Sequence, residues 1–153
     1  MQTINRRGAL GLGLAGTAAI VGVAAAAPAA ASPANNTSLV GTWALGVKFP
    51  DGTVNPTLIS FDSAGSVVET NALTRSTGLG AWQHGSGIQF SCLWWEQFFD
   101  ADNALQSHIR VEHHITLERG RDRYHGSGKG DVYDLNWNLV NTIATTFTAK
   151  RLN

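Results

Sequence analysis

The feature that most constrains this chain is a regular alternation of apolar and polar side chains over residues 105–117. Successive side chains of a β-strand point to opposite faces, so the alternation predicts a strand with one buried and one solvated face. The residues of the buried face are Leu105, Ser107, Ile109, Val111, His113, Ile115 and Leu117. No stretch of the chain shows a convincing period of 3.6 residues, and we therefore expect little helix.

Turn signals divide the rest of the chain into further candidate strands. The connecting segments are 50–52, 62–65, 72–80, 85–87, 100–103, 118–121 and 134–138. The candidate strands are 39–49, 57–61, 66–71, 80–84, 88–99, 105–117, 122–134 and 139–152. Evenly spaced strands joined by short turns are typical of a sandwich or an up-and-down barrel, and closure removes exposed sheet edges. The sequence therefore predicts an all-β fold, an eight-stranded antiparallel up-and-down β-barrel.

The beginning of the chain has the pattern of an export signal. Arg6 and Arg7 precede an uncharged run that ends in three alanines, Ala29–Ala31, a small-residue cleavage site. The paired arginines resemble a twin-arginine signal, which carries folded proteins across a bacterial membrane, although Ala9 stands where phenylalanine is usual. A permanent membrane anchor is the alternative, because the run is long enough to span. We expect residues 1–31 to be a removed signal peptide, 32–38 a flexible linker and 39–153 a secreted or cell-envelope barrel domain, with no membrane contact after cleavage.

Charge and cysteine content exclude several classes of function. The chain has 11 Lys and Arg against 11 Asp and Glu, so removal of Arg6 and Arg7 would leave a net charge of −2 and no basic stripe for nucleic acid. Cys92 is the only cysteine and cannot form an intramolecular disulfide. His113 and His114 point to opposite faces of a strand and cannot chelate one ion. We expect no cofactor and no metal.

Both ends of the predicted barrel resemble the lipocalin-like (calycin) barrels. Gly41-Thr42-Trp43 opens the first strand, and Arg151 lies near the end of the last. The middle of the chain resembles small secreted actinobacterial proteins of this shape, through segments 49–52, 69–71 and 78–82. The resemblance implies that Arg151 packs over Trp43 and closes one end of the barrel. The disulfides of that family and the helix before its last strand are absent.

The fifth candidate strand carries a carboxylate on an otherwise apolar face. Ile88, Phe90, Cys92, Trp94, Glu96 and Phe98 share that face. If the face points inward, burial raises the pKa of Glu96 and fits it for acid–base chemistry. Alternatively, Glu96 lies at the barrel mouth and reaches water. His113 on the next strand is expected beside Phe90 or Cys92, about six residues or 20 Å from Glu96, and more as a core residue than as a catalyst.

These residues leave three functions open. The first is a non-catalytic protein that binds a small apolar molecule in the barrel. The second is a cofactor-free cyclase or isomerase, with Glu96 as acid or base and Tyr124 as hydrogen-bond donor. The third is a filled barrel that serves as an interaction module. The candidate ligand-binding residues are Trp43, Phe49, Asn71, Trp82, Phe90, Trp94, Glu96, His113 and Tyr124.

Two other patterns call for a structural explanation. Leu93, Trp95 and Phe99 are expected on the outer face, as a surface for homo-oligomer formation or packed under the 72–80 loop. Gly126, Gly128 and Gly130 alternate within one strand. Alternating glycines favour strand bending at a tight barrel corner over ligand contact.

Overall fold

The structure is a computed structural model that describes residues 38–152. The predicted signal peptide and nearly all of the predicted linker lie outside the described residues. Eight strands make up the fold: β1 (Gly41–Lys48), β2 (Val54–Phe61), β3 (Ser66–Asn71), β4 (Ser76–His84), β5 (Gln89–Phe99), β6 (Leu105–Leu117), β7 (Arg123–Tyr133) and β8 (Leu139–Leu152). Within residues 38–152 no helix is long and apolar enough to cross a membrane.

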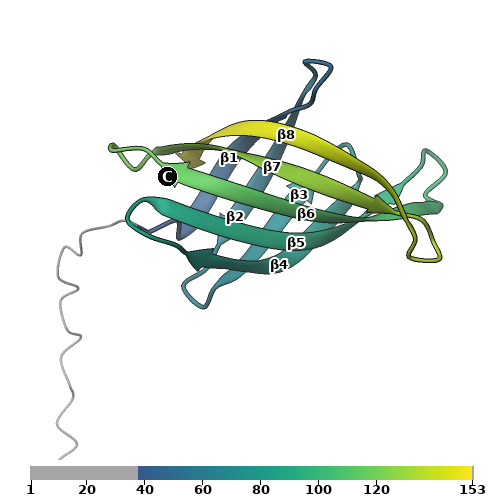
Figure 1. The fold of residues 1–153 in the computed structure, drawn as a ribbon, viewed down its shortest axis with the longest axis horizontal. Helices are drawn as coiled ribbons and strands as arrows, with labels where there is room; N and C mark the ends of the chain where they lie inside the picture. Colours follow the sequence, from purple (N-terminus) through teal and green to yellow (C-terminus); the bar gives the residue numbers. More distant parts are fainter. Residues whose placement is uncertain (1–37, 153) are drawn as a thin grey trace, which may run out of the picture. The chain divides into compact units, whose positions relative to one another are not determined.

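The strands form one closed barrel (Figure 1). Each strand pairs antiparallel with the next along the chain, and β8 closes the barrel against β1. The predicted all-β, eight-stranded, up-and-down barrel is therefore confirmed. Antiparallel pairing places the β1–β2, β3–β4, β5–β6 and β7–β8 hairpins at one end, here called the mouth. The other three hairpins and the two chain ends of the barrel lie at the opposite end, here called the closed end.

Two strands begin earlier than predicted. β4 begins at Ser76 rather than residue 80, and its first residues pair with Asn71 and Thr70 of β3. The predicted long loop 72–80 is therefore a four-residue connection followed by strand. β2 begins at Val54 and contains Pro56, which pairs with Gly46 of β1. Pairing of β2 with β3 starts only at Thr57, so Pro56 has a strand partner on one side only, as prolines in sheets do.

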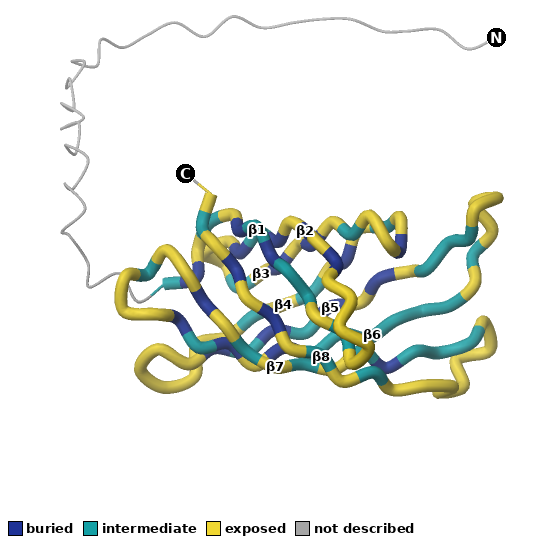
Figure 2. The backbone as a smooth tube through the Cα atoms, turned by 90° about the horizontal axis from the view of Figure 1, so that it is seen from above, coloured by how far each residue is buried: buried dark blue, intermediate teal, exposed yellow. Residues whose placement is uncertain are grey.

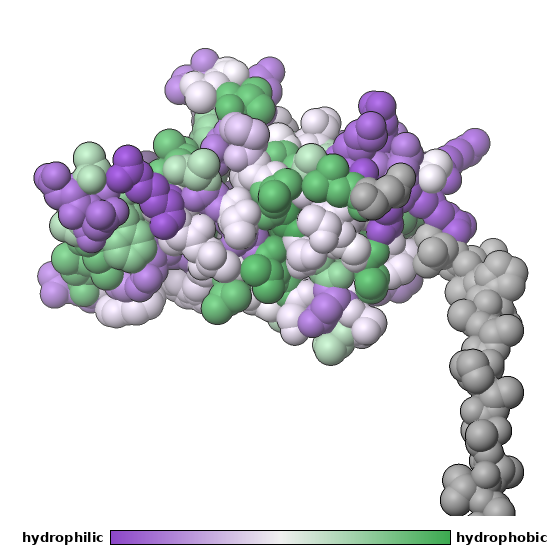
Figure 3. Space-filling view, turned by 180° about the vertical axis from the view of Figure 1, so that it is seen from behind, coloured by the Kyte–Doolittle hydropathy of each residue, from purple (hydrophilic) through white to green (hydrophobic). Residues whose placement is uncertain are grey.

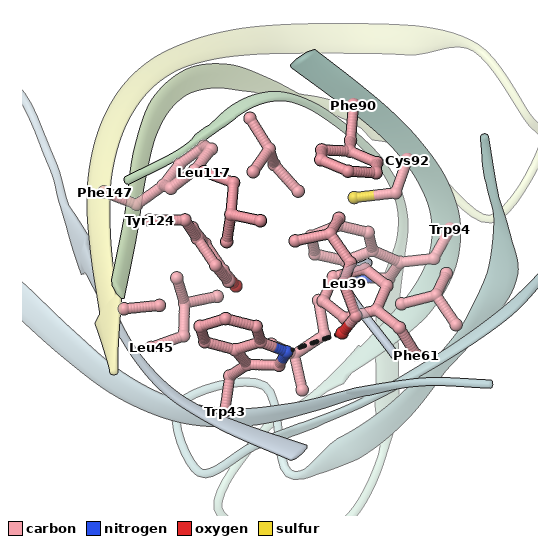
Figure 4. Packing of buried hydrophobic residues seen from close by; sticks show 14 residues of the cluster. Leu39, Trp43, Leu45, Phe61, Phe90, Cys92, Trp94, Leu117, Tyr124 and Phe147 are labelled. Atoms are coloured by element: carbon pink, nitrogen blue, oxygen red, sulfur yellow. Dashed lines mark hydrogen bonds between the residues drawn. The ribbon is translucent and has the colours of Figure 1, made fainter. Parts of the chain in front are cut away.

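The interior near the closed end is filled with side chains. Dark-blue buried positions alternate with exposed ones along the strands in Figure 2, and Figure 4 shows the large rings and aliphatic side chains in contact across the barrel. Trp43 packs against Tyr124 with ring centroids 4.7 Å apart, and its Nε1 donates a hydrogen bond of 2.9 Å to the Leu39 carbonyl. The buried apolar cluster is Leu39, Trp43, Leu45, Ile59, Phe61, Val67, Phe90, Cys92, Trp94, Ile115, Leu117, Tyr124, Phe147 and Ala149.

Arg151 covers the closed end. Its guanidinium carbon lies 4.1 Å from the centre of the Trp43 ring, the arrangement that the resemblance implied. The same guanidinium donates hydrogen bonds to the carbonyls of Ser38, Val40 and Arg121. The Arg151 guanidinium thus links the segment that leads into β1, the β6–β7 hairpin and the Trp43 ring.

The glycines of β7 make room for aromatic rings. A Cβ on Gly126 would lie 2.6 Å from Cζ of Phe147, and a Cβ on Gly128 would overlap the His113 ring. These two glycines allow the Phe147 and His113 rings to lie directly on the β7 backbone. The sequence had predicted strand bending at these positions and not this packing. Gly130 differs, because its position meets only Ile109, at 3.7 Å, and it borders open space inside the barrel.

Candidate functional site

The half of the barrel near the mouth is hollow. A cavity of about 310 Å³ lies between β1, β2, β3, β5, β6, β7 and β8, and the β3–β4 connection borders it with Leu73 and Thr74. Pockets that hold small ligands begin at about this size. The lining residues are Val47, Phe49, Asn55, Glu69, Asn71, Leu73, Thr74, Trp94, Glu96, Phe98, Ile109, Val111, His113, Gly130, Val132, Ile143 and Thr145.

The structure divides the predicted ligand-binding residues into two groups. Phe49, Asn71, Trp94, Glu96 and His113 line the cavity. The other four are part of the packing around the closed end: Trp43, Trp82, Phe90 and Tyr124. Tyr124 in particular packs between Trp43 and Phe147, where burial raises the pKa of its phenol. The structure therefore does not bring Tyr124 and Glu96 together at one site.

Glu96 is buried rather than exposed at the rim. Its exposed fraction is 6%, so the alternative in which it reaches water at the mouth is wrong. Burial in the largely apolar wall raises the pKa of the Glu96 carboxyl. Hydrogen bonds lower the pKa of Glu96 in turn. The Asn71 amide, at 3.4 Å, and the Thr74 hydroxyl, at 3.2 Å, both donate to Glu96 Oε2.

A second carboxyl, Glu69, lies beside Glu96. It is 2% exposed, and the two side chains are hydrogen-bonded to each other. Burial, together with the negative charge of Glu96, raises the pKa of Glu69 to about 8. At neutral pH Glu69 therefore holds a proton, which it donates to the Glu96 carboxylate. We call these two residues the carboxyl pair.

Sequence reasoning did not single out Glu69, although a signal for it was present. Asn71 is one of the predicted ligand-binding residues, and Glu69 is two residues earlier in the same predicted strand. Side chains at positions i and i+2 of a strand share a face, so Glu69 had to point inward with Asn71. The sequence did not show that inward side chains of β3 and β5 come together across β4. They do so because β4, which lies between these strands, has glycines facing inward there.

His113 forms part of the cavity wall next to the filled half. It pairs with Cys92, one of the two predicted partners, and is thus four residues rather than six from Glu96 along β5, or about 13 Å. Its ring stacks on the Phe147 ring, with centroids 4.0 Å apart, and meets the Trp94 ring edge-on, with centroids 4.7 Å apart. Burial lowers its pKa to about 3, so the imidazole is neutral, and its Nδ1 has no hydrogen-bond partner among the described residues.

The predicted outer stripe is covered in part by another element. The Trp95 ring lies against the rings of Tyr133 and of Trp137 in the β7–β8 hairpin, with centroids 5.4 Å and 5.6 Å apart. The sequence had suggested the 72–80 segment as the cover. Leu93 and Phe99 are half-buried. Exposed apolar residues also occur elsewhere on the barrel, and Figure 3 shows one face on which hydrophobic residues lie in the middle and hydrophilic residues gather toward both ends.

No family model, curated protein or solved structure matched the chain. Among residues 38–152, no group of three or more His, Cys, Asp or Glu side chains is placed to hold a metal ion. Cys92 is buried in the apolar cluster, which raises its pKa to about 12 and leaves it a poor nucleophile. The cavity with its carboxyl pair is therefore the site whose chemistry we consider.

Proposed function

We propose that this protein binds a small, largely apolar molecule in the cavity at the barrel mouth. The observation that carries the proposal is the cavity itself, about 310 Å³ in a barrel whose other half is filled. Its wall is apolar apart from one cluster of polar side chains, which is the composition of a ligand pocket. This volume favours ligand binding over a filled barrel that acts only through its surface.

Two features of the sequence support the proposal by analogy. The surroundings of Trp43 and Arg151 resemble the closed end of the lipocalin-like barrels, in which the opposite end takes up the ligand. The pattern of residues 1–31 supports export by the twin-arginine route, so we propose that the ligand is bound in the cell envelope or outside the cell.

Filling the cavity tests the proposal. Gly130 borders the cavity and a Cβ there makes only an ordinary contact with Ile109, at 3.7 Å, so Gly130→Leu adds an isobutyl group at the wall of the ligand space. We expect native mass spectrometry of the protein from its own host to show a copurified small molecule, and G130L to lose it. Ala144→Leu adds a side chain of the same size on the outer face of β8 and should retain the molecule. Retention by G130L would contradict binding in this cavity.

A second function, a cofactor-free cyclase or isomerase, is favoured by one observation. The carboxyl pair places a proton donor, Glu69, beside a proton acceptor, Glu96, at an apolar cavity, and a donor beside an acceptor can move a proton within a bound substrate. Titration of Glu96 by NMR tests this function. A Glu96 pKa at its ordinary solution value would argue against it and leave the binding function intact.

A further inference from the structure

The hydrogen bonds around the carboxyl pair converge on Glu96. Asn71 Oδ1 accepts from Asn55 Nδ2 at 2.8 Å and from the Leu73 backbone N–H at 2.9 Å, which fixes the Asn71 amide with its NH₂ group toward Glu96. The Thr74 hydroxyl also donates to Glu96. Both the Asn71 amide and the Thr74 hydroxyl thus act as donors to this carboxyl, which is the arrangement that an ionised carboxylate requires.

No basic side chain among the cavity-lining residues that the structure describes balances this charge. None of the residues that line the cavity is Lys or Arg. Besides the carboxyl pair, the only titratable residue in this lining is His113, whose ring is neutral. Arg75, which follows Thr74 in sequence, donates its hydrogen bonds to the carbonyls of Asp100 and Ala101. A carboxylate held among apolar walls without a cation is costly, and a ligand that supplies the cation is favoured.

The carboxyl pair also lies beside aromatic rings. Besides Glu96, the hydrogen-bonding neighbour of Glu69 is the buried Thr57 hydroxyl, which is a donor but not a cation. Three aromatic rings border the same cavity, from Phe49, Trp94 and Phe98. Aromatic faces attract ammonium groups, and their hydrocarbon surfaces accept an apolar body.

We propose that the cavity selects a small organic cation, whose ammonium group lies against Glu69 and Glu96 and whose apolar body fills the space between the aromatic rings and β7. This inference rests on the proposed binding function and names its ligand class. A neutral apolar molecule would occupy the same volume but would leave the Glu96 carboxylate without an opposite charge beside it.

Three probes that share one apolar body test the ligand class. These are 4-phenylbutylamine, 4-phenylbutanol and 5-phenylpentanoate, which carry an ammonium, a hydroxyl and a carboxylate on the same phenylbutyl group, with binding measured by calorimetry at pH 7. We expect the amine to bind at least tenfold more tightly than the alcohol, and the carboxylate to bind more weakly than both. Glu96→Gln should lower the affinity for the amine to the level of the alcohol. The affinity for the alcohol itself should change by less than threefold. Asp102→Asn removes an exposed carboxylate from a hairpin at the same mouth and should leave all three unchanged.

The unaltered protein supplies a second test in case E96Q does not fold. The amine keeps its proton between pH 5 and 9, whereas the carboxyl pair gains negative charge over this range. Affinity for the amine should therefore rise at least tenfold from pH 5 to 9, while affinity for the alcohol stays constant. His113 is neutral throughout and contributes no change.

The outcomes separate this inference from the function on which it rests. Equal binding of amine and alcohol, or tighter binding of the alcohol, overturns the organic cation and leaves cavity binding standing. Amine binding that neither E96Q nor pH alters also overturns it, since the cation would then lie elsewhere. Binding of none of the three probes, together with no copurified molecule, overturns the proposed function and this inference with it.

Discussion

Glu69 shows how one side chain can make stability depend on pH. Its pKa in the folded protein is about 8, against an ordinary value of 4.5, because folding buries it beside Glu96. Between these two values the folded state binds more protons than the unfolded state. The free energy of unfolding therefore falls as pH rises from about 4.5 to about 8. His113 acts with the opposite sign, since its lowered pKa costs stability as pH falls below 6.5 toward about 3.

Glu69→Gln isolates the first of these effects. A glutamine can still donate a hydrogen bond to Glu96, as protonated Glu69 does, but it has no proton to lose. We expect E69Q and the native protein to be about equally stable at pH 5. By pH 8, E69Q should be more stable by about 2 to 4 kcal/mol, at about 1.4 kcal/mol per unit of pKa shift. Urea unfolding at pH 5, 6.5 and 8 measures the difference, with D102N as the control. A constant difference would mean that Glu69 is not the buried proton holder.

At the scale of single elements, two of the three glycines of β7, Gly128 and Gly130, serve different purposes. The His113 ring lies on Gly128, and a Cβ there would overlap it, whereas a Cβ on Gly130 meets only Ile109 at an ordinary distance of 3.7 Å. Gly128→Ala should therefore destabilise the protein by about 1 to 3 kcal/mol, as overpacking does. Gly130→Ala should be neutral or stabilising by about 0.5 to 1 kcal/mol, because alanine loses less backbone entropy. Equal unfolding free energies for the two variants would contradict this division of the strand.

The elements also show how far the sequence could predict the fold. Alternation over 105–117 and the turn residues located all eight strands, because a barrel strand has one face inside and its hairpins need residues that adopt positive φ. Gly52, Gly65 and Asn103 fill such positions, but so does Trp137, at φ 64°, which no turn preference indicates. The start of β4 was missed because Gly78 and Gly80 look like loop residues, whereas both lie under the bulk of β5: the Trp94 indole covers Gly78, and the β5 backbone at Leu93 and Trp94 approaches Gly80.

The molecule as a whole combines a filled half and a hollow half, and this division was beyond sequence reasoning. Trp43 and Trp94 both point inward, yet one closes the barrel and the other borders the cavity. Which residues meet across a barrel depends on the stagger of all eight strands and on where glycines let rings lie flat. For the same reason the sequence offered Glu96 only as a candidate for an inward carboxylate, with exposure at the mouth as the alternative, and did not identify its partner on β3.

The division predicts that stability and binding can be changed separately. Arg151→Met would remove the cation over Trp43 and three hydrogen bonds to the carbonyls of Ser38, Val40 and Arg121, all at the closed end. We expect a loss of about 2 to 4 kcal/mol in the free energy of unfolding, because each lost bond of this charged donor costs on the order of 1 kcal/mol or more. Affinity for a cavity ligand should change by less than threefold, since none of these groups borders the cavity. G130L should show the reverse, with binding lost and stability retained. Calorimetric titration and urea unfolding of both variants test the pair. If R151M abolished binding while still folded, the two halves would be coupled, and the closed end would have to be treated as part of the site.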